Sequence, residues 1–152
     1  MAQVRYSNSF PFLVDDDRDY VRLLRRTLEK IGIPPTAIRT CADGDEAVAL
    51  LAKGEWKPSF TLLDVRMPGR SGLDVLEWIR ASPSLALHPV FMMTGSSHPD
   101  HVGKAFHLGV GSYFIKPTQS RDLEGILEGI LAYSHRHPDP TVIRTSLAPE
   151  RA

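Results

Sequence analysis

Five short apolar runs alternate with five amphipathic segments along this sequence, and that alternation constrains the fold more than any other feature. Each run precedes a stretch whose apolar residues recur at helical spacing. Most of the runs contain no alternating polar residues, which is typical of strands covered on both faces of a parallel sheet. We therefore predict strands at residues 10–14, 37–41, 60–64, 90–94 and 112–116, and helices at 21–31, 43–52, 71–80, from 97 or 100 to 108, and 120–134.

This order of elements predicts an α/β protein in which a parallel sheet carries helices on both faces. Crossovers between parallel strands are right-handed in nearly all proteins, and the commonest five-strand arrangement is the flavodoxin-like (βα)5 fold, a doubly wound parallel sheet with strand order 2-1-3-4-5. Ligands bind in that fold at the carboxyl ends of the strands, near strands 1 and 3. Pro11 lacks a backbone N–H, so the first strand begins either at Phe12 or with Pro11 in its first position.

Length and composition fit one globular domain. The 152 residues are 42% apolar and 24% charged, which allows one sizeable core. We expect a flexible N-terminus over residues 1–9, the domain over 10–134 and a short tail over 135–152. A formal net charge of zero argues against direct DNA binding through a general electrostatic footprint. The single cysteine, Cys41, excludes an internal disulfide and fits a small buried residue of the second strand.

No segment of the sequence indicates secretion or membrane insertion. The N-terminal stretch MAQVRYSNSF lacks the apolar region of a signal peptide. No apolar run approaches the roughly 18 residues that a membrane-spanning helix needs. We expect the protein in the cytoplasm.

Charged and hydroxyl side chains gather at the carboxyl ends of four predicted strands. Asp15 and Asp16 follow the first strand, Asp64 ends the third, Thr94 the fourth and Lys116 the fifth. Three carboxylates at one edge repel one another unless a cation joins them, and Mg²⁺, with Mn²⁺ as an alternative ion, is the natural candidate. The ammonium would neutralise further charge, and the hydroxyl would donate to an added oxygen. A carboxylate held in this way can act as a nucleophile and form an aspartyl phosphate.

Four short motifs resemble those of receiver domains in two-component response regulators. They are an aspartate pair after the first strand (VDDD, 14–17), a lone aspartate followed by Met-Pro and Gly (DVRMPGRSG, 64–72), a threonine ending the fourth strand (MTG, 93–95) and Lys-Pro after the fifth (FIKP, 114–117). Their spacing is typical of that family, and the resemblance covers roughly residues 8–134. The sequence is thus similar to receivers of the single-domain type. It is also similar to the small receivers partnered with bacterial phytochromes, in being stand-alone with a short tail.

The resemblance assigns the chemistry of the site to particular residues. Asp64 resembles the phosphoacceptor, and Lys116 resembles the lysine that contacts the phosphoryl group. Asp15 and Asp16 resemble the Mg²⁺-binding acids, with Asp64 and the main-chain carbonyl of Arg66 completing the metal ligands. The family's members are signalling switches that catalyse their own phosphorylation and dephosphorylation, so we do not expect an enzyme with a separate substrate.

The resemblance also assigns a switch. Thr94 resembles the switch hydroxyl, and Tyr113 stands at the position of the family's aromatic switch residue. Pro117 matches a proline whose preceding peptide bond is commonly cis, so we expect a cis bond between Lys116 and Pro117. Met-Pro after the phosphoacceptor is expected to shape the loop that exposes Asp64.

Other polar residues near the motifs have simpler interpretations. Asp17 is expected to cap the first helix rather than to bind the ion. Arg66 would either shield the phosphoryl bond or pair with nearby acids. The basic stretch of the first helix is either a solvated face or the contact for the phosphodonor protein, and the histidines of the fourth helix and the tail are expected at the surface. These residues are Arg22, Arg25 and Arg26, and His98, His101, His135 and His137.

The resemblance implies partners as well. A sensor histidine kinase or a phosphotransfer protein would donate the phosphoryl group, and the face of the fourth helix, fifth strand and fifth helix would then bind an unknown downstream protein. Because residues 135–152 are too few for a DNA-binding module, we expect the output to be a protein–protein contact, a phosphorelay step or a homodimer.

Two other functions compete with this hypothesis. A receiver fold used as a phosphorylation-independent interaction module would not need the complete set of acids, threonine and lysine. A flavodoxin-like nucleotide or flavin binder needs a glycine-rich phosphate loop after the first strand, where this sequence has three aspartates. The phosphorylation switch is therefore the function that the sequence favours.

Overall fold

The computed structural model describes residues 8–136, which form five parallel strands and five α-helices in the predicted alternation. The strand order is β2-β1-β3-β4-β5, so the flavodoxin-like (βα)5 prediction is confirmed. Within these residues, no helix is both long enough and apolar enough to cross a bilayer. The elements are β1 (Pro11–Val14), α2 (Arg18–Ile31), the 3₁₀ helix η1 (Pro35–Ala37), β2 (Arg39–Cys41), α3 (Gly44–Lys53), β3 (Phe60–Leu63), α4 (Gly72–Ala81), β4 (Val90–Thr94), α5 (Pro99–His107), β5 (Ser112–Ile115) and α6 (Ser120–Arg136).

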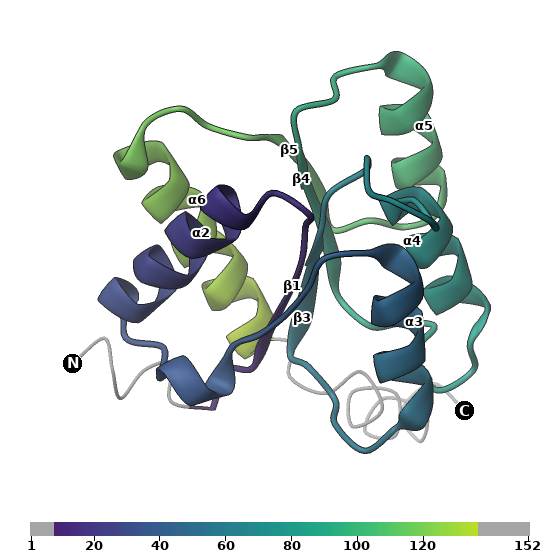
Figure 1. Ribbon diagram of the computed structural model, residues 1–152, viewed down its shortest axis with the longest axis horizontal. Coiled ribbons are helices and arrows are strands. Elements are labelled where there is room, and N and C mark those ends of the chain that lie inside the picture. The colour runs from purple at the N-terminus through teal and green to yellow at the C-terminus, as the bar shows by residue number, and fades with distance from the viewer. Residues whose placement is uncertain (1–7, 137–152) are drawn as a thin grey trace.

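Two helices cover one face of the sheet and three cover the other. Figure 1 shows α2 and α6 on one face and α3, α4 and α5 on the opposite face. Each face has its own core, because successive strand residues point to opposite sides. Leu13 of β1 joins the core under α2 and α6, whereas Phe12 and Val14 join the core under α3, α4 and α5. The whole of β1 is buried, as its uninterrupted apolar run predicted.

Prolines set the ends of two strands. Pro11 occupies the first position of β1, opposite Phe60 of β3, which is the second of the two predicted alternatives. Ala37, expected in the second strand, belongs instead to η1, because Pro35 starts a 3₁₀ turn there. Cys41 ends β2 as the expected small buried residue, and burial raises the pKa of its thiol to about 12.

The predicted terminal segments lie mostly outside the described residues. The flexible N-terminus was expected over 1–9, of which residues 1–7 are not described, and the tail was expected over 135–152, of which 137–152 are not. His137 falls in that undescribed part. The last helix continues to Arg136, past the predicted end at 134. The domain boundaries therefore stay predictions.

Gly72 lets the loop after β3 fold back against the end of that strand. Its backbone N–H donates to the carbonyl oxygen of Val65 at 2.9 Å. A Cβ added at Gly72 would overlap the carbonyl oxygen of Asp64. The absence of a side chain at the start of α4 is therefore what allows the helix to begin so close to Asp64.

Gly72→Ala should lower the free energy of unfolding by about 1–3 kcal/mol, because the added methyl group fits beside the Asp64 carbonyl only if the backbone moves. Gly129→Ala is the matched control. Gly129 lies inside α6 with open space around it, so alanine there should raise the free energy of unfolding by about 0.4–1 kcal/mol. Urea unfolding followed by circular dichroism measures both. A gain of stability in both variants would contradict the close approach at Gly72.

Candidate functional site

Three carboxylates meet at the carboxyl edge of the sheet. β1 and β3 are neighbours in register, Val14 opposite Leu63, so the residues that follow them, Asp15 and Asp64, stand side by side. The backbone N–H of Asp64 donates to the carbonyl of Val14 at 3.0 Å, which continues the ladder to this point. Asp15, Asp16 and Asp64 each offer an oxygen within 4.8 Å of the others. The structure thus brings together the three predicted acids.

Lys116 reaches this cluster from the end of β5. Its Nζ lies 2.8 Å from Oδ2 of Asp15 and 3.2 Å from Oδ2 of Asp64. Its backbone N–H donates to the carbonyl of Thr94 at 2.8 Å, which holds the end of β5 against the end of β4. The ammonium is therefore shared by two carboxylates that come from two different strands.

The prediction of a cis bond between Lys116 and Pro117 is wrong. No cis peptide bond occurs in residues 8–136, so this bond is trans. The expectation came from the resemblance, in which a cis bond before this proline places the lysine head at the site. The trans chain already brings the ammonium into contact with Asp15 and Asp64, and trans is the intrinsically favoured form before proline.

Burial and the contacts between charged groups act in opposite directions on the pKa values of the cluster. Asp15 is 5% exposed, and this desolvation raises its pKa to about 6, even though the hydrogen bond and charge of Lys116 act in the opposite direction. For Lys116, burial acts to lower the pKa, but the hydrogen bonds and charges of Asp15 and Asp64 outweigh it and raise the pKa above its ordinary value. One ammonium faces three carboxylates, so the site has a deficit of positive charge.

The aspartates of the run 15–17 have different surroundings. Oδ1 of Asp15 accepts the backbone N–H of Asp17 at 2.9 Å, which fixes the turn after β1. Oδ1 of Asp17 accepts the N–H of Tyr20 at 3.1 Å and caps α2, as predicted. Asp16 is exposed beside the cluster. Asp15 orders the loop, Asp16 adds an exposed carboxylate to the cluster, and Asp17 starts the helix.

A hydrogen-bond network joins the predicted switch residues. Thr94 is 1% exposed, and its hydroxyl accepts the backbone N–H of Ser96 at 3.2 Å. The Tyr113 hydroxyl donates to the carbonyl of Ser96 at 2.6 Å. The Ser96 hydroxyl shares a hydrogen bond of 2.6 Å with Nδ1 of His101 on α5. Ser96 thus connects β4, β5 and α5 immediately beside the acid cluster.

A pocket of about 510 Å³ opens over the phosphoacceptor candidate. Its lining includes Asp64, Arg66, Thr94, Ser96 and His98. Arg66 is exposed at this opening and makes no ion pair with an acid of the described residues, so the structure does not show the predicted alternative in which it pairs with acids. Small residues after Thr94 leave the approach to Asp64 open.

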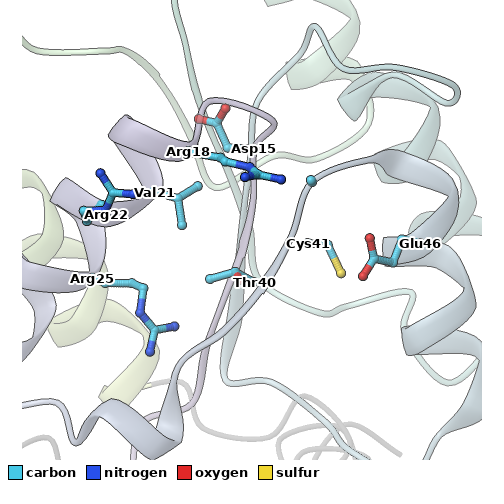
Figure 2. A pocket seen from close by; sticks show the side chains of 9 residues that line it. Asp15, Arg18, Val21, Arg22, Arg25, Thr40, Cys41 and Glu46 are labelled. Atoms are coloured by element: carbon cyan, nitrogen blue, oxygen red, sulfur yellow. The ribbon is translucent and has the colours of Figure 1, made fainter.

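Asp15 also lines a second pocket, of about 520 Å³, between α2, β2 and the start of α3. Figure 2 shows arginines of α2 on one wall of this pocket and residues of β2 and α3 on the other. Arg22 pairs with Asp19 at 3.3 Å in an exposed contact, and Arg25 lies half-buried in the wall. Arg26 is exposed and does not line the pocket. Whether this helix contacts a phosphodonor protein stays a prediction.

The sequence analysis missed three contacts of the site. His101 was expected to be a plain surface residue, but it is half-buried and bonded to Ser96. His98 is exposed as expected, and it caps α5 by accepting the N–H of Asp100 at 3.2 Å. Tyr20 places its ring against Lys116, with Nζ 4.6 Å from the ring centroid. His98 acts locally, at the start of its own helix, whereas the contacts of His101 and Tyr20 depend on side-chain directions that residue spacing does not specify.

Comparison with known proteins gives one family. The family described as "Response regulator receiver domain" matches residues 12–128. The chemotaxis protein CheY of Pseudomonas aeruginosa is 32% identical over 118 residues, which span 78% of this chain and 92% of that protein. Two solved structures are each 29% identical and cover 79% of this chain and 89% of their own. They are the phosphorylated cyanobacterial phytochrome response regulator RcpA, with a TM-score of 0.71, and the Mn²⁺-bound form of response regulator Rcp1, with 0.68.

The Asp15 carboxyl should titrate near pH 6, and Lys116→Met should raise its pKa further, because the substitution removes the hydrogen bond and the charge that favour the ionised form. Carboxyl ¹³C NMR over a pH series measures both values, with the surface variant Lys104→Met as the control. The folded state binds this proton more tightly than the unfolded chain, whose value is near 3.8. Through this group the free energy of unfolding therefore falls as the pH rises from about 4 to about 6. A lower Asp15 pKa in Lys116→Met would contradict the conclusion that Lys116 favours the ionised form of Asp15.

Proposed function

Because the chain belongs to the response regulator receiver family, we propose that it is a phosphorylation switch in which Asp64 accepts a phosphoryl group. The donor in this proposal is the phosphohistidine of a sensor histidine kinase or a phosphotransfer protein. The observation that carries the proposal is the contact of Lys116 with both Asp15 and Asp64, at 2.8 and 3.2 Å. A carboxylate can approach a negatively charged phosphoryl group only where positive charge is already in place.

The acid cluster fits a hard divalent cation. Three carboxylates with oxygens within 4.8 Å of one another are the ligand type that Mg²⁺ and Mn²⁺ prefer. The similar protein Rcp1 is described as bound to Mn²⁺. In the proposal, Asp15, Asp16, Asp64 and the main-chain carbonyl of Arg66 hold Mg²⁺, or Mn²⁺ in its place. When bound, the ion supplies charge that offsets the charge of the phosphoryl oxygens.

The protein's own residues carry the transfer. An oxygen of Asp64 forms a bond to phosphorus while the bond from phosphorus to the donor nitrogen breaks, and the nitrogen keeps the electron pair. Lys116 already touches Asp64, so its ammonium is within reach of an oxygen on the attached phosphoryl group. The open pocket over Asp64 gives the donor access. In this proposal the protein modifies itself and has no separate substrate.

The network around Ser96 supports a switch. The Thr94 hydroxyl is buried beside Asp64 and would donate to a phosphoryl oxygen, and Tyr113 is already linked to the same loop through Ser96. In the proposal, these contacts shift the face made by α5, β5 and α6 toward a form that binds a partner. Phe106 on α5 is 55% exposed and Ile115 on β5 is 48% exposed. Large exposed apolar side chains on this face fit a downstream protein or a second copy of the chain.

Acetyl phosphate with Mg²⁺ should add the mass of one phosphoryl group to the intact protein, because Asp64 lies open to the pocket with Lys116 beside it. Intact mass spectrometry measures the gain, which should be absent in Asp64→Asn and retained in Asp122→Asn, a surface substitution on α6. No mass gain with this donor or with any phosphohistidine donor would favour the phosphorylation-independent interaction module instead. An equal gain in Asp64→Asn would place the phosphoryl group elsewhere.

Asp16→Asn should weaken Mg²⁺ binding by on the order of tenfold, because it removes one of the three clustered carboxylates. Asp17→Asn is the matched control, since it removes a neighbouring charge but keeps the oxygen that caps α2. Isothermal titration calorimetry of the two variants and the wild type gives the comparison. If both variants lost the same affinity, the loss would come from the removal of a negative charge near the site. Asp16 would then not be a ligand of the ion.

A further inference from the structure

Tyr20 presents its ring to the ammonium of Lys116, although it belongs to none of the four sequence motifs. Nζ lies 4.6 Å from the ring centroid, inside the roughly 6 Å within which the negative face of an aromatic ring attracts a cation. The same Nζ lies 2.8 Å from Asp15 and 3.2 Å from Asp64. The ammonium is therefore held by two carboxylates and one aromatic face, which come from three different segments of the chain.

The start of α2 fixes the place of this ring. Asp17 accepts the N–H of Tyr20 in the first turn, and the Tyr20 hydroxyl lies 3.5 Å from Sδ of Met93, a buried residue of β4. Burial, followed by the charges of Asp15 and Asp17, raises the pKa of Tyr20 to about 12, so the phenol stays neutral. A partly buried ring that is held at both ends has little freedom to move away from the lysine.

In the proposed function, the carboxylates of Asp15 and Asp64 also bind other groups, whereas the ring of Tyr20 does not. Asp15 and Asp64 are both proposed metal ligands, and Asp64 is also the proposed phosphoacceptor. Lys116 therefore shares each of its oxygen partners with another cation or with the transferred group. Tyr20 offers no charged oxygen, so its attraction for the ammonium does not depend on what the carboxylates bind.

We propose that Tyr20 is a positioning residue for Lys116, which keeps the ammonium directed at the edge where Asp15 and Asp64 meet. The contact stands on geometry alone, whereas its consequence, faster phosphorylation of Asp64, rests on the proposed function. A residue that only filled the core would tolerate any apolar side chain of similar volume. A positioning residue of this kind requires the negative ring face, so the two roles respond differently when the ring keeps its shape and loses that charge.

Four forms of the protein separate these roles: the wild type, Tyr20→Phe, Tyr20→Leu, and a form with pentafluorophenylalanine at position 20. Phenylalanine keeps the ring face and loses only the weak contact with Met93. Leucine removes the ring. The fluorinated ring keeps its shape, but its fluorine atoms withdraw negative charge from the face. Comparison of phenylalanine with its fluorinated form is therefore the decisive pair, and it remains available even if Tyr20→Leu fails to fold.

The first measurement is the order of the Lys116 side chain, from ¹³C relaxation of its ε-methylene group in metal-free protein. We expect wild-type order in Tyr20→Phe and greater mobility in Tyr20→Leu and in the fluorinated form. The second measurement is the initial rate of Asp64 phosphorylation by acetyl phosphate with Mg²⁺. We expect this rate to stay within about twofold of wild type in Tyr20→Phe and to fall by on the order of fivefold in the other two forms.

Each outcome decides one of the two proposals. If Lys116 is as ordered in the fluorinated form as in Tyr20→Phe, the ring acts through its volume alone and the positioning role is overturned. If the order changes as expected but the phosphorylation rates of all forms are equal, the ring positions the lysine, and the proposed consequence for the rate of transfer is overturned. If the order changes as expected and no form is phosphorylated, the contact with Lys116 is supported and the proposed function fails.

Discussion

Two buried carboxylates share one ammonium at the carboxyl edge of the sheet, and the surrounding structure depends on this charge balance. Asp15 is 5% exposed and Asp64 is 7% exposed, so neither side chain is well solvated, and unpaired charges in such a place are costly. Lys116 contacts both, yet burial still holds the pKa of Asp15 at about 6. One ammonium does not balance two buried acids and the exposed Asp16. The remaining negative charge is the physical reason why a divalent cation fits this site.

The register of the sheet brings the two acids together. Val14 and Leu63 are paired, so the residues that follow them in β1 and β3 reach the same point of the edge. A shift of one residue in either strand would turn its side chains to the opposite face and separate the carboxylates. Both strands are buried on both sides, which makes such a shift expensive. The packing of the two cores therefore also determines the position of the acids.

The sequence predicts the residues whose place follows from periodicity, and it misses the contacts that depend on side-chain directions or on loop geometry. Asp15, Asp64 and Lys116 end strands, and the topology of a parallel sheet puts all strand ends of one kind at one edge. His101 and Tyr20 reach the site across different elements, so their contacts depend on side-chain directions that no hydrophobic pattern encodes. The wrong cis prediction before Pro117 has the same origin. It assumed a loop geometry that the trans chain makes unnecessary.

The edge of the sheet also determines where a change at Asp64 can be transmitted. Lys116 is bonded to the carbonyl of Thr94 through its backbone and to Asp64 through its side chain. The Thr94 hydroxyl accepts the N–H of Ser96, and the Ser96 hydroxyl is bonded to His101 on α5. A group on Asp64 can shift the protein between two forms only by binding one form better than the other. In the proposed switch, a form that draws the Thr94 hydroxyl toward Asp64 either breaks its bond with the Ser96 N–H or moves Ser96 with it. Where Ser96 moves, its 2.6 Å bond to His101 couples that movement to α5, because breaking the bond costs free energy.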